Sequence, residues 1–311
     1  MTYKLKFKDI LHTNQFSVED LDFIFSTAKQ MEKIITWESQ WGQLKWKIMA
    51  SLFYEPSTRT RLSFESAMKR LGGEVITVSE AGTSSFSKGE TLEDNSIITS
   101  MYSDIIVMRH PQIGSVKKSA DITHLSVINA WDWSNQHPTQ ALLDVYTILK
   151  EKKRLNNLKI AIVWDLKFWR TAHSLVYLMW LYKNIEFSFI SPTELKIPEK
   201  VTSFLNDKNI DYSETDSYIE WLKDVDVLYV TRIQKERFTD ISEYENLKDD
   251  FVLNLELLNN AKTDITIMHP LPRVNEVDSE VDKLPNAAFF RQAQNGVPVR
   301  MALLKILCER V

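Results

Sequence analysis

Apolar residues follow two patterns along this chain: short continuous runs, and longer segments in which they recur at helical spacing. Residues 48–53 (IMASLF) form a run that is typical of a strand buried on both faces of a sheet. Before this run, residues 17–20 (SVED) have the form of a capping box that starts a helix. Further strands are predicted at 74–78, 104–109, 126–130, 159–163, 185–190, 225–231 and 264–268. Short apolar strands separated by helices indicate parallel α/β sheets that are covered on both faces.

The order of these elements predicts two doubly wound parallel-sheet domains with helices on both faces. The chain has 311 residues, which is enough for two domains of ordinary size. A long amphipathic helix that begins at Pro138 separates the two series of strands and is the expected hinge. The final amphipathic segment, 297–310, could pack on either domain.

Composition narrows the classes of function. The chain has 38 Lys and Arg against 42 Asp and Glu, so its formal charge is −4, which argues against a protein that coats nucleic acid or a membrane surface. The single cysteine, Cys308, excludes a disulfide framework. The apolar stretches are too short to span a bilayer, and the start of the chain lacks the apolar core of a signal peptide. A soluble, cytoplasmic protein is therefore expected.

Candidate chemistry gathers at the carboxyl ends of the predicted strands, where open parallel sheets bind their ligands. The groups found there are residues 57–61 (STRTR), 109–110 (RH), 135–140 (NQHPTQ), 165–171 (DLKFWRT), 232–235 (RIQK) and 269–273 (HPLPR). Each group alone is typical of a solvated surface or an ordinary loop. Together they favour a site for anionic ligands, in which arginines hold the charges and an imidazole donates a hydrogen bond. The first group opens a helix, and hydroxyls and arginines at a helix start suit a phosphate.

Other chemistries lack sequence support. The chain has no G-x-G-x-x-G, no G-x-x-x-x-G-K-[ST] and no G-x-S-x-G motif. Its six histidines show no spacing typical of metal ligands. We therefore expect neither a metal site nor a cofactor.

Taken in order, these motifs resemble the aspartate/ornithine transcarbamylase family. The matching segments are 53–66 (FYEPSTRTRLSFES), 88–90 (KGE), 107–111 (VMRHP), 134–140 (SNQHPTQ), 165–167 (DLK), 170–171 (RT), 231–237 (TRIQKER) and 269–273 (HPLPR). The last two favour aspartate as the second substrate. The resemblance implies transfer of a carbamoyl group from carbamoyl phosphate to the amino group of L-aspartate. The products would be N-carbamoyl-L-aspartate and phosphate, in an early step of de novo pyrimidine biosynthesis.

The resemblance also implies domain boundaries and residue roles. Residues 1–138 would bind carbamoyl phosphate, completed by a returning C-terminal helix at about 291–311, and residues 139–290 would bind aspartate. The implied catalytic residues are Arg59, Thr60, Arg109 and His137. The implied ligands of carbamoyl phosphate also include Ser57, Thr58 and Gln140. The implied ligands of aspartate are Arg170, Thr171, Arg232, Gln234, Leu271 and Pro272, the last two joined by a cis peptide bond.

Family members work as trimers, and the resemblance implies that Ser84 and Lys88 reach into a neighbouring subunit's site. A homotrimer is therefore expected, with a regulatory chain as a possible further partner. Two alternatives stay open. The chain could be a transcarbamylase for a different amine such as ornithine, or a catalytically impaired member of the family that serves as a scaffold or binding protein.

The second alternative arises from a shortage of glycine. The chain has 7 Gly and 9 Trp. Where the family pattern has glycine in active-site loops this chain has Trp131, Trp133, Trp164 and Trp169, and Trp46 looks similar. Glycine at a strand end typically permits a positive φ or a close backbone approach to a ligand, which an indole does not. Three explanations remain: shifted loops that hold the indoles, impaired activity, or a sequence that misstates these residues.

Overall fold

The chain divides into two compact units, residues 1–142 with 294–311 and residues 143–293. This computed structural model describes residues 3–38, 42–79, 89–132, 136–217, 222–234, 238 and 252–309. Both boundaries between the units fall inside helices, α5 (Pro138–Lys152) and α10 (Phe289–Cys308). The predictions for Ser84, Lys88 and Trp133 concern positions outside the described residues.

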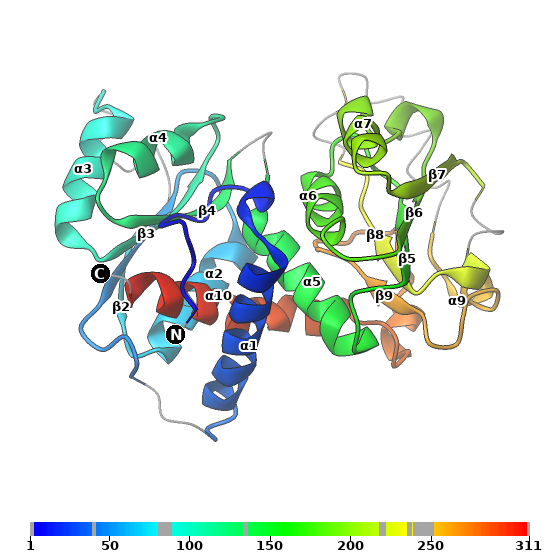
Figure 1. The fold of residues 1–311 in the computed structure, drawn as a ribbon, viewed down its shortest axis with the longest axis horizontal. Coiled ribbons are helices and arrows are strands. Elements are labelled where there is room, and N and C mark those ends of the chain that lie inside the picture. Colours follow the sequence, from blue (N-terminus) through cyan, green and yellow to red (C-terminus); the bar gives the residue numbers. More distant parts are fainter. Residues whose placement is uncertain are drawn as a thin grey trace. The chain divides into compact units, whose positions relative to one another are not determined.

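The first unit is built on a four-stranded parallel sheet with the strand order β2-β1-β3-β4. Its strands are β1 (Ile48–Phe53), β2 (Glu74–Val78), β3 (Ile105–His110) and β4 (Ser126–Asp132). Its helices are α1 (Val18–Ile35), α2 (Thr58–Arg70), α3 (Leu92–Tyr102), α4 (Ser115–Ile122) and the end of α10, with a 3₁₀ turn at Thr13–Gln15. Helices α3 and α4 lie on one side of this sheet and α1, α2 and α10 on the other (Figure 1).

Local sequence explains how this unit forms. The predicted capping box starts α1, because the Ser17 hydroxyl accepts from the Asp20 backbone N–H while the Asp20 carboxylate accepts from that of Ser17. Alternate residues of the strands face opposite sides. Ala50 and Leu52 of β1 pack in one apolar cluster with Val116 of α4. This face of the sheet is therefore covered by α4, and α1, α2 and α10 lie on the other side (Figure 1).

The second unit is built on a five-stranded parallel sheet with the strand order β7-β6-β5-β8-β9. Its strands are β5 (Leu158–Val163), β6 (Ile185–Ile190), β7 (Asp211–Thr215), β8 (Val227–Val230) and β9 (Thr266–Met268). Its helices include α6 (Arg170–Met179), α7 (Glu199–Asp207) and α9 (Leu255–Leu258), with 3₁₀ turns at Thr193–Leu195, Leu222–Asp224 and Ser279–Lys283. Two parallel α/β sheets confirm the predicted fold class.

Three elements differ from the sequence prediction. Strand β7 was not predicted, because it lies at the sheet edge and its residues (DYSET) are polar and partly exposed. The sequence predicts a helix near 171–182, whereas α6 runs from Arg170 to Met179 and ends earlier. Helix α10 begins at Phe289, eight residues before the amphipathic segment 297–310 and two before the start implied by the resemblance. The pattern missed this start because residues 291–295 (RQAQN) are mostly polar and Pro298 lies inside the helix. Among the described helices, none is both long enough and apolar enough to span a bilayer.

Candidate active site

Each sheet has one place where the chain order reverses between neighbouring strands. In the first unit this place lies between β1 and β3, and in the second between β5 and β8. Ligands of open α/β sheets bind outside the carboxyl ends of the strands at such a switch point. Arg109 lies at the carboxyl end of β3, and Arg232 follows β8. The candidate residues therefore gather at the switch point of each sheet.

The loop after β1 leads directly into the N-terminus of α2. Ser57 is the N-cap residue of this helix, with an extended backbone and no side-chain cap bond. The first backbone N–H groups of a helix have no partner within the helix and carry a positive partial charge. Thr60 is buried in the first turn, whereas Arg59 beside it is exposed. This helix start can therefore bind an anion with backbone donors, hydroxyls and a guanidinium.

Arg109 is a mostly buried cation at the end of β3. Its Nη2 lies 3.5 Å from a carboxylate oxygen of Glu55. Burial lowers the pKa of Arg109 to about 10, although the Glu55 carboxylate opposes this, and the nearby charge of Arg59 lowers it further. The Arg109 Nε is buried and has no hydrogen-bond partner among the described residues. A buried donor of this kind is suited to an acceptor atom of a ligand.

His137 lies immediately before α5 and is buried. Its backbone carbonyl accepts from Gln140 and Ala141, which fixes the start of the helix. Burial lowers the pKa of His137 well below its ordinary value, and the charges of Arg300 and Arg109 lower it further. The imidazole is therefore neutral at pH 7, and a neutral ring can still donate a hydrogen bond from one nitrogen.

Arg300 is a residue that the sequence reasoning missed. It belongs to α10, is only 3% exposed, and its guanidinium lies 5.1 Å from the ring centroid of Phe64 on α2. Its charge contributes to the lowered pKa of His137. A single arginine within an otherwise apolar helical stretch, 297–304 (VPVRMALL), was the signal that could have identified it.

In the second unit, two arginines lie at the carboxyl edge of the sheet. Arg170 is the first residue of α6, after β5, and Arg232 follows β8. The Arg232 guanidinium lies 5.6 Å from the ring centroid of Trp169. Gln234 follows two residues later, and its backbone N–H lies 3.4 Å from an Asp165 carboxylate oxygen. Two cations and an amide side chain at one sheet edge suit a ligand with two carboxylates.

Asp165 connects the two loops that carry these residues, a role that the sequence reasoning did not assign to it. Its carboxylate accepts from the Phe168 backbone N–H at 2.8 Å and from Gln234, and its own N–H donates to the Thr231 hydroxyl at 2.9 Å. Burial raises the pKa of Asp165 to about 6, although these hydrogen bonds oppose the shift. The loops after β5 and β8 are therefore held together by one buried carboxyl group.

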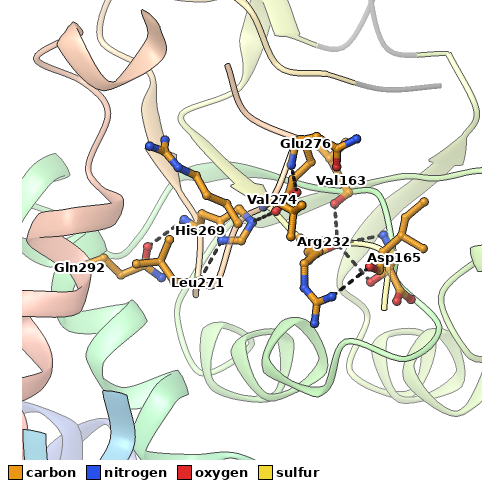
Figure 2. Close-up of polar contacts among 12 residues, drawn as sticks. Val163, Asp165, Arg232, His269, Leu271, Val274, Glu276 and Gln292 are labelled. Atoms are coloured by element: carbon orange, nitrogen blue, oxygen red, sulfur yellow. Dashed lines mark hydrogen bonds and ion pairs between the residues drawn. The ribbon is translucent and has the colours of Figure 1, made fainter. Parts of the chain in front are cut away.

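The loop after β9 is organised by His269 (Figure 2). The Leu271 backbone N–H donates to His269 Nδ1 at 2.8 Å, so Nε2 carries the proton and donates to a Glu276 carboxylate oxygen, also at 2.8 Å. Burial lowers the pKa of His269, although Glu276 opposes this. Burial alone would raise the pKa of Glu276, but the hydrogen bond and charge of His269, together with backbone hydrogen bonds, outweigh it and the pKa is lowered. The Leu271–Pro272 peptide bond is cis, which confirms that prediction.

Gln292 on α10 joins this loop to a buried polar network. Its side-chain carbonyl accepts from the His269 backbone N–H at 2.8 Å, and its amide donates to Asp144 at 2.7 Å. Asp144 also accepts from the Tyr229 hydroxyl, which contacts the Thr171 hydroxyl at 3.1 Å. Thr171 therefore takes part in the packing of this network. Gln292 and Asp144 gave no sequence signal, since their partners lie far away along the chain.

We expect Gln292→Leu to destabilise the protein and to weaken binding at this loop. The variant leaves the buried His269 N–H without an acceptor, and removes one donor from Asp144. Each buried group left unsatisfied costs about 1–3 kcal/mol. Denaturant unfolding measures the loss of stability. Gln294→Leu, two residues further on the same helix but exposed, is the matched control and should unfold like the parent. Equal stability of both variants would contradict the role given to Gln292.

A second expected result concerns pH and His173 on α6. Its Nε2 lies 2.6 Å from the Leu166 carbonyl oxygen, and burial lowers its pKa to about 4. Between pH 6.5 and 4 the unfolded chain binds a proton at this ring and the folded chain does not, so stability falls as the pH falls. A shift of this size corresponds to about 3 kcal/mol. The raised pKa of Asp165 acts in the opposite direction, so the contribution of His173 is measured as a difference.

The measurement compares denaturant unfolding of the parent and His173→Gln at several pH values between 7 and 4. The variant should lose less stability than the parent as the pH is lowered. His124→Gln, which changes an exposed ring, is the control and should follow the parent curve. Parallel curves for the parent and His173→Gln would show that folding does not lower the pKa of this ring.

Most of the described tryptophans at expected glycine positions have a glycine-like backbone conformation, but one does not. The backbone φ is 73° at Trp46, 120° at Trp131 and 98° at Trp164, as expected for sites that suit glycine. Trp169 is different, because its φ is −81° and it simply caps α6. A tryptophan is ordinarily a core anchor, a role that suits a strand-end loop poorly. This expectation is wrong for Trp164, since its side chain is 1% exposed and packs in the core of the second unit.

Trp131 bears directly on the candidate site. Its ring centroid lies 4.1 Å from the guanidinium carbon of Arg109, so the indole covers one face of that cation. Trp180 lies outside these loops, where a tryptophan is expected to be a core anchor. Its side chain is only half-buried, with Lys208 Nζ 4.7 Å from its ring centroid. Among the described residues there is no cluster of His, Cys, Asp and Glu that could hold a metal ion.

Comparison with known proteins adds to this geometry. Residues 8–150 match the family model "aspartate/ornithine carbamoyltransferase, carbamoyl-P binding domain", and residues 156–307 match "aspartate/ornithine carbamoyltransferase, Asp/Orn binding domain". The chain is 49% identical over 302 residues to the aspartate carbamoyltransferase catalytic subunit of Methanocaldococcus jannaschii, covering 97% of this chain and 98% of the relative. It is 51% identical over 292 residues to that of Methanococcus maripaludis, covering 94% and 95%.

Solved structures agree. The M. jannaschii catalytic subunit superposes with a TM-score of 0.92 at 48% identity, covering 98% of this chain and 99% of that one. Aspartate transcarbamoylase from Trypanosoma cruzi in complex with carbamoyl phosphate and aspartate has a TM-score of 0.90 at 36% identity, covering 97% of each chain. The same enzyme has also been solved with N-(phosphonacetyl)-L-aspartic acid, and there the TM-score is 0.88.

Proposed function

Because the chain belongs to the aspartate/ornithine carbamoyltransferase family, we propose that it transfers the carbamoyl group of carbamoyl phosphate to the amino group of L-aspartate. The products are N-carbamoyl-L-aspartate and phosphate, in an early step of pyrimidine biosynthesis. The observation that carries this proposal is the presence of cationic groups at the switch points of both sheets. Arg109 serves the first sheet, and Arg170 and Arg232 serve the second.

Carbamoyl phosphate binds to the first unit. Its phosphate accepts hydrogen bonds from the N-terminus of α2, where Ser57, Thr58 and Thr60 supply backbone and hydroxyl donors. Arg59 adds a charge-assisted contact from the same turn. Arg59 is exposed on this turn, so its guanidinium can reach a ligand at the helix start.

The carbamoyl group lies beside Arg109 and His137, with Gln140 at its amide nitrogen. Attack on the carbamoyl carbon builds negative charge on the carbonyl oxygen, and fixed donors aimed at that oxygen lower the barrier. Arg109, Thr60 and His137 are the donors. Neutral His137 donates a hydrogen bond without adding a further positive charge beside Arg109 and Arg300. The burial and the two charges that lower the pKa of His137 therefore keep the ring in the form that this role needs.

Aspartate binds to the second unit. Arg170 holds the α-carboxylate, and Arg232 with Gln234 holds the β-carboxylate. The cis bond between Leu271 and Pro272 lies beside the reacting amine, and Thr171 supports the site through the Tyr229 hydroxyl. Asp165 keeps the loops of Arg170 and Arg232 in one arrangement.

The reaction needs only these groups and the two substrates. The aspartate nitrogen forms a bond to the carbamoyl carbon, the bond from that carbon to the phosphate oxygen breaks, and the departing phosphate accepts the amine proton. Holding two anions in register supplies much of the rate, because it removes the entropy cost of bringing them together. No cofactor or metal takes part in this scheme.

The proposal extends to assembly and location. Ser84 and Lys88 act in the site of a neighbouring subunit, so the working form is a cytoplasmic homotrimer, to which a regulatory chain could bind. Light scattering of the purified protein measures the mass of the assembly, and a monomer at assay concentrations would contradict shared sites.

The activity is tested with purified protein, carbamoyl phosphate and either aspartate or ornithine. We expect carbamoyl-aspartate to form and carbamoyl-ornithine not to form, because Arg232 and Gln234 can both donate to a carboxylate, and the charge of Arg232 repels an ammonium group. Product from ornithine alone would overturn the choice of substrate. Absence of product from both would favour the second candidate, an impaired binding protein, which is supported by the indole of Trp131 over Arg109.

A further inference from the structure

Residues with positive φ fall into two groups in this chain. Lys153, Asn157, Asn184, Asn209 and Leu271 have φ values of 52–58°. This is the ordinary left-handed region, which asparagine visits easily. The described glycines of positive φ, at 42, 72, 89 and 114, have φ values of 80–94°. The chain therefore keeps its more extreme positive values for glycine, with one type of exception.

That exception is tryptophan. Trp46, Trp131 and Trp164 have φ values of 73°, 120° and 98°, all beyond the range of the asparagines. Bulky side chains are genuine outliers at positive φ, because their Cβ lies too close to the backbone. Three tryptophans in glycine-type conformations, in a chain with 7 glycines in all, require one common explanation.

A fourth tryptophan marks the end of a helix. Trp37 has a φ of 62° and follows α1. The Glu38 N–H donates to the Lys33 carbonyl at 2.7 Å and the Trp37 N–H donates to the Ile34 carbonyl at 3.2 Å. These two bonds define a Schellman motif, whose left-handed position is usually glycine. The Trp37 side chain is 82% exposed, so packing gives no reason for an indole there.

Trp46, which lies in a turn, is a second exposed tryptophan with a positive φ. Its side chain is 83% exposed, and the ring contact that it makes is with the adjacent Lys45, whose Nζ lies 4.9 Å from the ring centroid. Exposed indoles at Trp37 and Trp46 gain almost no burial energy, while their backbone conformations carry strain. Glycine would remove this strain at both positions without leaving a cavity.

We infer that the cell which makes this protein inserts glycine, not tryptophan, at positions 37, 46, 131 and 164. One coding change explains all four, because the codon UGA, which some genetic codes read as tryptophan, differs from the glycine codon GGA in one base. A glycine tRNA with one altered anticodon base would read UGA as glycine. This inference rests on backbone geometry and does not depend on the proposed function.

The inference changes the candidate site at position 131. The Trp131 indole covers a face of Arg109, and glycine would leave that guanidinium open to a ligand. At position 164 the packing of the side chain favours tryptophan, whereas the backbone conformation favours glycine. Its indole fills part of the core, but its φ of 98° is typical of the chain's glycines. With glycine at 164, neighbouring side chains must occupy the volume that the indole fills.

The direct test is peptide mass spectrometry of the protein purified from its own cells, together with the codons of its gene. Glycine at positions 37, 46, 131 and 164, each encoded by UGA, is the expected result. Tryptophan in these peptides, or UGG at these codons, would overturn the inference. This test has a clear outcome even if the protein has no transcarbamylase activity.

Engineered variants test the same inference on protein that carries the tryptophans. Trp37→Gly and Trp46→Gly should each raise Tm by about 2 °C or more, since they relieve strain in a unit of ordinary size. Trp180→Gly is the control, because its φ of −61° suits any residue, and it should lower Tm through loss of ring contacts with Phe204 and Lys208. A lower Tm for both Trp37→Gly and Trp46→Gly would contradict the inference. In the active protein, Trp131→Gly should also raise kcat/KM.

Discussion

Replacing Arg59 by alanine is expected to lower kcat/KM by about 10²–10³-fold, the usual effect of removing one fixed donor from a developing or bound negative charge. Arg59 lies in the first turn of α2, beside backbone N–H groups that have no partner within the helix. Its exposed side chain contributes little to packing, so the loss should appear in catalysis and not in stability. Steady-state kinetics with carbamoyl phosphate varied at saturating aspartate measures the effect.

The matched control for Arg59 is Arg61, two residues further along the same helix. Arg61 faces Glu65 at 4.0 Å, one turn away, and has no proposed ligand. Arg61→Ala should therefore keep kcat/KM within a few-fold of the parent, as expected for a surface pair of low energy. If Arg59→Ala turns over like Arg61→Ala, the phosphate does not bind at this helix start.

Replacing Arg232 by alanine is expected to raise the KM for aspartate by about 10²-fold and to leave the KM for carbamoyl phosphate nearly unchanged. The reason is the loss of charge-assisted hydrogen bonds to one carboxylate, each worth about 1.5–3 kcal/mol. Arg232 follows β8 at the switch point of the second sheet, and its guanidinium is placed against Trp169. The separation of the two KM values is the diagnostic result.

Arg154 provides the control for this variant, because it is an arginine at the opposite edge of the same sheet. It pairs with Asp226, just before β8, at 3.2 Å, and Asp226 keeps Lys262 as a second partner at 3.3 Å. Arg154→Ala should therefore leave both KM values unchanged. An unchanged KM for aspartate in Arg232→Ala would remove this arginine from the binding site.

Much of the fold could be predicted from the sequence, because strands that are buried in a parallel sheet consist of short apolar runs. Strands β1 and β6 match their predicted limits for this reason. Strand β7 was not predicted, because a partly exposed strand at the edge of a sheet needs no apolar run. The pattern missed the start of α10 because the polar stretch 291–295 (RQAQN) separates its first two residues from the apolar part of the helix. Periodicity therefore predicts what is buried better than where an element ends.

The candidate site was predictable to the extent that its residues follow strands directly. The structure places Arg109 and Arg232 at strand ends as expected. Gln292 and Arg300 were missed, since both lie on a helix far along the chain and act through partners that only the folded unit brings near. Asp165 lies in one of the predicted motifs, but its hydrogen bonds to the loop after β8 require β5 and β8 to be neighbours. The sequence alone does not reveal this strand order.

The division of α10 between the two units has a consequence for the order of events during synthesis. The second unit is one continuous stretch, 143–293, whereas the first unit is complete only with residues 294–311. Chains emerge from the ribosome N-terminus first and domains generally fold as units. The first unit therefore stays incomplete until the last residues are made. Until then the surface that later packs against Leu303 and Leu304 stays uncovered. We expect ribosome-bound chains from which residues up to 293 have emerged, but not 294–311, to hold a protected second unit and a protease-sensitive N-terminal half.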